Sequence, residues 1–151
     1  MSIEDLQITY QRADLGTLKQ MLKVLGEVFD EMSTYQDKIA SDAYLESRLM
    51  DDSFIALAAT AEGRTVGALA AYVLKKFEQE RAEIYIYDLG VLEPFRRRGV
   101  ATGLINKVRE VAREIGAYVI FVQADSGDEP AIRLYESLGT REDVHHFDII
   151  P

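Results

Sequence analysis

The chain has 151 residues and a formal net charge of −9, with 48% hydrophobic and 28% charged residues. This length predicts one domain over residues 1–151, and the acidity argues against nucleic acid or a membrane as the main partner while leaving room for a cationic one. The absence of cysteine excludes disulfides and thiolate chemistry. Because the sequence shows no export signal and no long apolar run, we expect a cytoplasmic protein. The alternative to a cationic partner is that the negative net charge serves only to keep the protein soluble.

The N-terminal part predicts a strand followed by two helices. Residues 6–10 alternate apolar and polar side chains, as an edge strand does. Asp14 is placed to cap a helix whose apolar side chains recur at helical spacing as far as Phe29. After a polar loop over residues 33–40, a second, shorter helix is predicted over residues 41–51.

The middle of the chain predicts three strands. Residues 53–61 and 65–74 are two apolar runs separated by a short turn in which Gly63 can adopt a positive φ, and together they predict a hairpin. Their alanine content makes helix the competing interpretation, but their length favours strands. Residues 83–92 alternate isoleucine and tyrosine and predict a strand buried on at least one face.

The last third predicts a helix over residues 99–115, a strand over 117–124, a helix over 129–138 and a final strand over 144–150. The element order is therefore β α α β β β α β α β. An α/β protein of this order, with some α+β character, has a mixed sheet with helices on both faces.

The sequence FRRRGVA, residues 95–101, joins a predicted strand to a predicted helix. Unpaired backbone N–H groups at the start of a helix, together with its dipole, attract phosphate. Gly99 lets the backbone approach a ligand, Ala101 keeps the first turn small, and arginines add charge-assisted contacts. The segment lacks the lysine of the ATPase phosphate loop and the G-x-G-x-x-G of dinucleotide folds.

In the pattern R-x-x-G-x-A, formed by Arg96, Gly99 and Ala101, the segment resembles the pyrophosphate loop of the GNAT superfamily of acetyl-CoA-dependent N-acetyltransferases. AIRLYESLG, residues 131–139, looks like the tyrosine-bearing helix of such domains. Residues 53–150 resemble, more specifically, aminoglycoside 3-N-acetyltransferases of the gentamicin-acetylating type. The resemblance implies a mostly antiparallel central sheet, acetyl-CoA as cosubstrate, an aminoglycoside 3-amino group as acceptor with antibiotic resistance as the consequence, and a homodimer.

The resemblance also implies where the cosubstrate lies. Strand residues beside the pantetheine arm offer a backbone N–H to the acetyl carbonyl, a bulge near Gly90 separates two strands, and the following loop holds the pyrophosphate. The expected cosubstrate-binding residues are Leu89, Gly90, Val91, Arg96, Arg97, Arg98, Gly99, Val100, Ala101 and Thr102.

Two side chains are the candidate catalytic groups. Tyr135 is the expected general acid for the departing thiolate, because the resemblance places it near the sulfur; its alternative is packing on the inner face of its helix. Asp88 is the expected base, because it interrupts an apolar strand where an unpaired charge is costly to bury. Its alternative is a structural ion pair with an arginine.

Acidic side chains crowd the C-terminal part, with seven acids against two arginines from residue 123 onward. A polycationic sugar would be drawn there, and we expect it to bind Asp125, Asp128, Glu129 and Asp148. Helix capping is an equally good interpretation of Asp128, and both roles can coexist.

No metal site is expected. His145 and His146 are adjacent, so on a strand they point to opposite faces, and no third ligand stands at a suitable spacing. Two other functions stay open: acetylation of another amine, such as a polyamine, an amino acid or a protein N-terminus, and a non-catalytic module that binds acetyl-CoA.

Overall fold

The computed structural model describes residue 2 and residues 5–151, which form two compact units. The first unit extends to Phe121 and contains the sheet and four α-helices of the described residues. The second unit, Val122–Pro151, contains α5. None of the described helices is long and apolar enough to cross a membrane.

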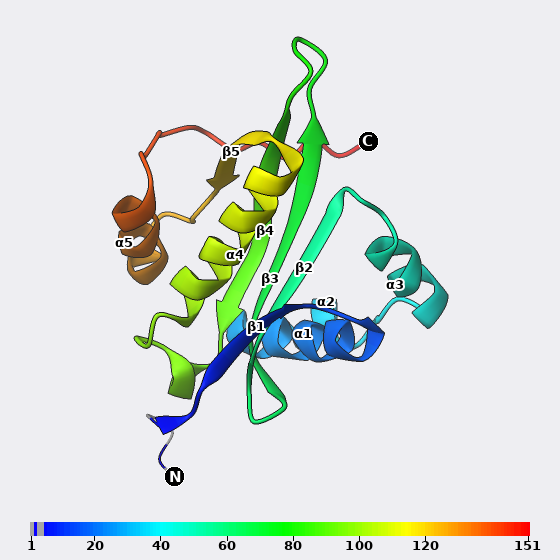
Figure 1. Ribbon diagram of the computed structural model, residues 1–151, viewed down its shortest axis with the longest axis vertical. Helices are drawn as coiled ribbons and strands as arrows, with labels where there is room; N and C mark the ends of the chain where they lie inside the picture. The colour runs from blue at the N-terminus through cyan, green and yellow to red at the C-terminus, as the bar shows by residue number, and fades with distance from the viewer. Residues whose placement is uncertain (1, 3–4) are drawn as a thin grey trace. The chain divides into compact units, whose positions relative to one another are not determined.

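The first unit is built on a five-stranded sheet with the order β1-β2-β3-β4-β5 (Figure 1). The first four strands are antiparallel to their neighbours, and the β2–β3 hairpin turns through Glu62 and Gly63, both with positive φ. The strands are β1 Ile8–Arg12, β2 Phe54–Ala61, β3 Arg64–Lys75, β4 Ala82–Val91 and β5 Ala117–Val122.

Strand β5 lies beside the first half of β4. The Tyr118 hydroxyl donates to Glu83, and the ring of Phe121 stacks on Tyr85 at 4.6 Å between centroids. Because residue numbers rise together in the two strands, they run parallel. The sheet is therefore mixed and mostly antiparallel, as predicted.

Two helices cover opposite faces of the sheet. On one face lies α1 (Leu15–Val28), so close that a Cβ atom added at Gly90 would be 3.0 Å from the Val28 side chain. On the other face lies α4 (Val100–Ile115), where a Cβ atom added at Gly67 would be 3.1 Å from the Val100 side chain. Glycine at both positions lets the helices pack closely on the strands.

Capping groups fix where the helices begin. Asp14 accepts a hydrogen bond from Thr17 N at the start of α1, and Ser41 accepts one from Tyr44 N at the start of α3 (Asp42–Leu49). Both helices were predicted. The short α2 (Met32–Tyr35) lies inside the segment predicted to be a loop, and β1 begins two residues later than predicted.

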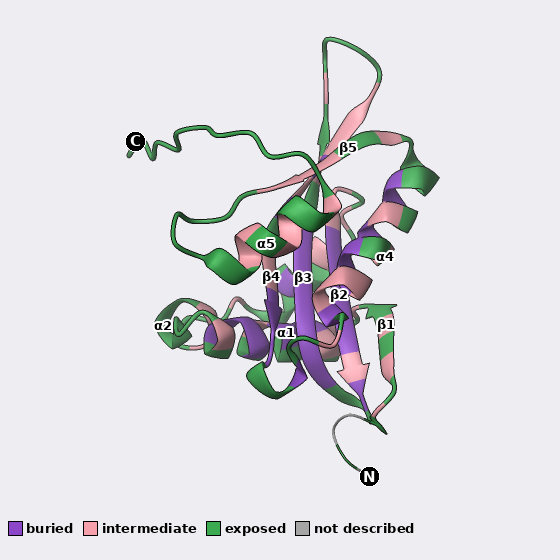
Figure 2. Cartoon of the chain, turned by 90° about the vertical axis from the view of Figure 1, so that its left-hand side faces the viewer, coloured by how far each residue is buried: buried purple, intermediate pink, exposed green. Residues whose placement is uncertain are grey.

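The core of the first unit lies along β2, β3 and β4 and against the inner faces of α1 and α4 (Figure 2). Its largest fully buried side chains are Met21, Ile55, Val66, Leu69, Ile84, Ile86, Val100, Leu104 and Val108. Burial of these side chains drives the packing of the sheet with its two covering helices.

A β-bulge in β4 changes which side chains share a face. Ala71 of β3 is opposite Ile86, but Ala70 is opposite Asp88, so Tyr87 is an extra residue in β4. Because side chains alternate in a strand, the insertion moves Asp88 from the buried face of Ile86 to the opposite face. The bulge predicted near Gly90 therefore lies three residues earlier, at Tyr87.

In the second unit, Asp128 caps α5 (Glu129–Leu138) by accepting from Ala131 N at 3.4 Å. The strand predicted over residues 144–150 is wrong, because the structure has no strand there. A strand needs a hydrogen-bonding partner strand, and residues 144–150 are paired with none of the strands that the structure describes. The apolar alternation of this segment therefore leaves Phe147 and Ile149 more than 80% exposed.

Candidate functional site

The connection from β4 to α4 presents unpaired backbone N–H groups. Gly99 precedes α4 with φ of 77°, and no side chain in the described part of the chain caps the helix. The first intrahelical bond runs from Gly103 N to Gly99 O, so the three N–H groups of residues 100–102 have no partner within the helix. Apart from Gly99 and its two chain neighbours, no atom of the described residues lies within 4 Å of the position that a Cβ at Gly99 would take. This helix start is open to an anion.

The three arginines before Gly99 differ in their environments. Arg96 Nε donates to Val91 O at 3.0 Å and ties the loop to the end of β4. Arg97 is exposed and has φ of 62°, and Arg98 donates to Leu6 O at 3.4 Å. Arg98 Nη1 is buried without a hydrogen-bond partner among the described residues. The loop is thus held in place by two of its arginines and leaves the third, Arg97, facing solvent.

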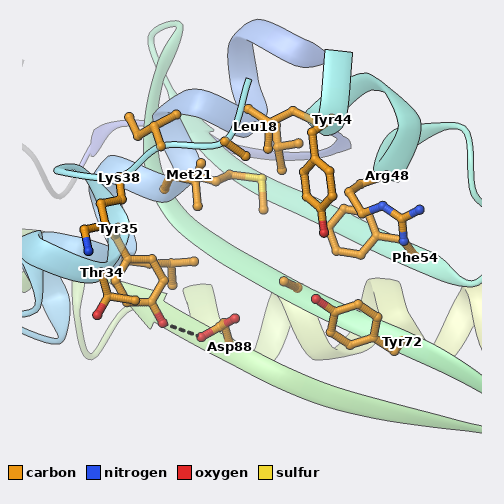
Figure 3. Close-up of a pocket in the computed structure, with 16 residues that line it drawn as sticks. Leu18, Met21, Thr34, Tyr35, Lys38, Tyr44, Arg48, Phe54, Tyr72 and Asp88 are labelled. Atoms are coloured by element: carbon orange, nitrogen blue, oxygen red, sulfur yellow. Dashed lines mark hydrogen bonds between the residues drawn. The ribbon is translucent and has the colours of Figure 1, made fainter. Parts of the chain in front are cut away.

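A cavity of about 280 Å³ lies on the α1 face of the sheet, between β2, β3 and β4 and the first three helices (Figure 3). Asp88 lines it at one end, where Tyr35 of α2 donates a hydrogen bond to Asp88 Oδ1 at 2.7 Å. Three aromatic side chains and two cations also line it: Tyr44, Phe54, Tyr72, Lys38 and Arg48. The β4 bulge therefore turns a carboxylate from the core face into a cavity.

Burial controls the charge of the carboxyl group in this cavity. Loss of solvent raises the pKa of Asp88 above its ordinary value, the hydrogen bond from Tyr35 opposes this rise, and the negative charge of Glu31 adds to it. Burial, with the hydrogen bond to Asp88, raises the pKa of Tyr35 above its usual range, so its phenol stays protonated. The arginine ion pair that was the alternative for Asp88 is not found among the described residues, where the side-chain partner of Asp88 is Tyr35.

Comparison with known proteins assigns the family. The profile of the "Acetyltransferase (GNAT) family" matches residues 20–140, which include parts of both units. The chain belongs to the GNAT acetyltransferase family. Members of this family use acetyl-CoA, and the start of α4 in this GNAT protein has open N–H groups with arginines before it.

Solved structures of aminoglycoside acetyltransferases are similar to this GNAT protein. The acetyltransferase HMB0005, from an uncultured soil metagenomic sample, is 51% identical with a TM-score of 0.92, covering 100% of this chain and 99% of that one. The acetyltransferase meta-AAC0020, also from soil and solved with sisomicin, is 30% identical with a TM-score of 0.87, covering 97% and 96%. Among curated proteins, N-alpha-acetyltransferase 50 of Danio rerio is 30% identical over 85% of this chain and 74% of its own length.

The predicted site residues of this GNAT protein fall in both units. Asp88, the strand residues 89–91 and the loop residues 96–102 belong to the first unit. Tyr135 lies on α5 in the second unit, where partial burial and then the charge of Asp128 raise its pKa above the ordinary value of 10.0. Its phenol is therefore protonated at neutral pH.

The four predicted substrate-binding acids all lie in the second unit and are exposed. Asp128 caps α5, and Asp125 O accepts a hydrogen bond from Asp128 N. Asp148 lies 2.9 Å from His146 Nε2, and Glu129 is in the first turn of α5. Among the residues that the structure describes, no three side chains are grouped as a metal site would require.

Sequence reasoning missed Tyr35, which lies within the segment predicted to be a polar loop. A tyrosine in such a loop gives no periodic signal, because its partner Asp88 is 53 residues away in the chain. It missed Arg48 and Tyr72 for a related reason. Both lie in elements that were predicted, yet only the packing of α3 on the sheet shows that Arg48 and Tyr72 line one cavity.

Proposed function

We propose that this protein transfers the acetyl group of acetyl-CoA to an amine of an aminoglycoside, with the 3-amino group as the acceptor and antibiotic resistance as the consequence. The observation that carries the proposal is the 51% identity, over the full chain, with an aminoglycoside acetyltransferase. The cavity with a partly buried carboxylate at one end supports the same chemistry, because an acceptor amine must lose a proton before it attacks.

Asp88 acts as the base in this proposal. The amine enters as an ammonium, binds the Asp88 carboxylate and gives it a proton. The freed nitrogen forms a bond to the carbonyl carbon of the thioester, the carbon–sulfur bond breaks, and the thiolate takes a proton from Tyr135. The bonded nitrogen loses its second proton to the Tyr135 phenolate, and Asp88 releases the first proton to solvent. The raised pKa of Asp88 suits this role, because a base works best when its pKa approaches the working pH.

The acetyl-CoA site is proposed along the end of β4 and the start of α4. The N–H groups of residues 100–102 and the charge of Arg97 receive the pyrophosphate, Gly99 allows its close approach, and Arg96 and Arg98 stiffen the loop. Backbone groups of residues 89–91 bind the pantetheine arm and polarise the acetyl carbonyl.

The exposed acids of the second unit are proposed to hold the remaining ammonium groups of a polycationic sugar. Asp125 and Glu129 are exposed, while Asp128 and Asp148 also make the local contacts described above. We further propose that residues 1–151 act as one domain, because the family profile continues across the boundary between the units, and that the protein is a homodimer.

An acceptor panel tests this function. Purified protein is given acetyl-CoA with gentamicin, sisomicin, spermidine or a peptide with a free N-terminus, and thiol release is measured together with the acetylated product. The proposal predicts the highest kcat/KM with the aminoglycosides and modification of one amine per molecule. Turnover confined to the peptide would instead favour the activity named for the Danio rerio relative.

A further inference from the structure

The two ends of the cavity are chemically different. Asp88 is opposite Ala70 in the sheet, whereas Tyr72 lies two residues further along β3, which is about 7 Å along the strand. Phe54 is opposite Tyr72 on the next strand, and their rings are 5.5 Å apart. Figure 3 shows Phe54 and Arg48 gathered at the end away from the Tyr35–Asp88 pair.

Arg48 is the polar group of this aromatic end. It lies on α3 with its guanidinium 5.6 Å from the ring centre of Tyr44, and Nη1 is 3.4 Å from an Asp51 oxygen. The other Asp51 oxygen accepts two hydrogen bonds from Ser53. Arg48 Nε is buried and has no hydrogen-bond partner among the described residues. A buried donor of this kind is costly unless a bound acceptor satisfies it.

The charges of the cavity favour an ammonium group at the Asp88 end and disfavour one at the aromatic end. Asp88 is the only carboxylate among the described residues that line it, and Lys38 and Arg48 are both cationic. An ammonium beside Asp88 is attracted, but a second one at the aromatic end meets Arg48 in a partly desolvated setting, where like charges repel more strongly than in water. A hydroxyl or ether oxygen at that end can instead accept the free Nε–H.

We propose that Arg48 is a specificity-determining residue, which accepts an oxygen-bearing ring in the cavity and rejects a second ammonium at the aromatic end. This inference rests on the proposed function and narrows its substrate class. At about 280 Å³ the cavity is at the small end of ligand pockets, so it holds one ring and not a whole aminoglycoside. The ring that enters carries the reacting amine and hydroxyl groups, and its aliphatic C–H faces pack on Phe54 and Tyr72.

Two small probes that differ in one group test the inference: trans-4-aminocyclohexanol and trans-1,4-diaminocyclohexane. Their dissociation constants are measured from backbone amide shifts in the full-length protein at neutral pH. We expect the amino alcohol to bind roughly tenfold more tightly than the diamine, with the difference falling as salt is added. Arg48→Gln should bring the two affinities within about twofold, and Arg48→Lys should keep the rejection of the diamine.

The matched control is Lys19→Gln, which removes an exposed cation that pairs with Asp42 outside the cavity and should leave the ratio unchanged. Equal affinities in the unchanged protein, an unaltered ratio in Arg48→Gln or no binding of either probe would overturn the inference. The measurement needs no turnover. Absence of aminoglycoside acetylation with an intact probe ratio would therefore refute the proposed function while leaving the preference assigned to Arg48 in place.

Discussion

Asp88 and Tyr35 form the best-defined polar contact of the cavity, and its geometry gives a test at the scale of one hydrogen bond. Tyr35 donates to Oδ1 and leaves Oδ2 available for an amine. Other titratable groups near the carboxyl are Glu31, Lys38, Tyr72 and Tyr87.

The Tyr35→Phe variant removes the hydrogen-bond donor that stabilises the Asp88 carboxylate. The pKa of Asp88 should therefore rise further, and the acidic limb of the plot of kcat/KM against pH should move to higher pH. The control is Tyr72→Phe, which removes a cavity hydroxyl that does not donate to Asp88 and should leave the acidic limb at its original pH. An acidic limb that stays at its original pH in Tyr35→Phe would refute the positioning role of Tyr35.

Tyr135 carries the second test at this scale. Its raised pKa keeps the phenol protonated, which a general acid requires. Tyr135→Phe should lower kcat by about 100-fold while leaving the affinity for CoA unchanged, measured by thiol release and by calorimetry. Tyr118→Phe on β5 is the control, because that hydroxyl bonds to Glu83. A kcat for Tyr135→Phe equal to that of the control would assign Tyr135 to packing alone.

The start of α4 tests the account at the scale of an element. Gly99 has φ of 77°, so Gly99→Ala forces a side chain into a left-handed conformation that costs about 1–2 kcal/mol. If the loop shifts to relieve this strain, calorimetry should show CoA affinity reduced by about fivefold or more. Gly16→Ala, inside α1 at ordinary φ and with 3.7 Å to the nearest atom, should leave CoA affinity intact. Equal affinities for the two variants would show that the Gly99 conformation does not matter to the cosubstrate.

Most elements could be predicted from the sequence because their signals are local. The apolar spacing of α4 lies between Gly99 and Gly116, and both glycines have a positive φ in the structure. The bulge at Tyr87 gives no such signal, since it is defined only by the register between two strands. Asp88 could be named as a buried acid, but the face it occupies could not be predicted. The prediction of a final strand over residues 144–150 was wrong because the sequence pattern indicates only that a segment can pair as a strand, and not that a partner strand is present.

At the scale of the molecule, the first unit depends on α4 packing against the sheet. Leu104 is fully buried on the inner face of α4, so Leu104→Ala should lower the free energy of unfolding by about 2–5 kcal/mol. Leu74→Ala, at the exposed end of β3, should cost less than about 1 kcal/mol. Denaturant unfolding checks both. Equal losses for the two variants would contradict the placement of the core.

The central claim is that an amine loses its proton to Asp88 before it attacks acetyl-CoA. The most direct test is the ratio of kcat/KM for gentamicin between Asp88→Asn and the unchanged protein, with CoA affinity measured on the same samples. If Asp88 is the base, kcat/KM falls by about 10²- to 10⁴-fold while CoA affinity is unchanged. Stability should be equal or higher at neutral pH, because burial raises the pKa of Asp88 and its ionisation above that pKa destabilises the fold. An Asp88→Asn protein that acetylates gentamicin at the original rate would contradict the account.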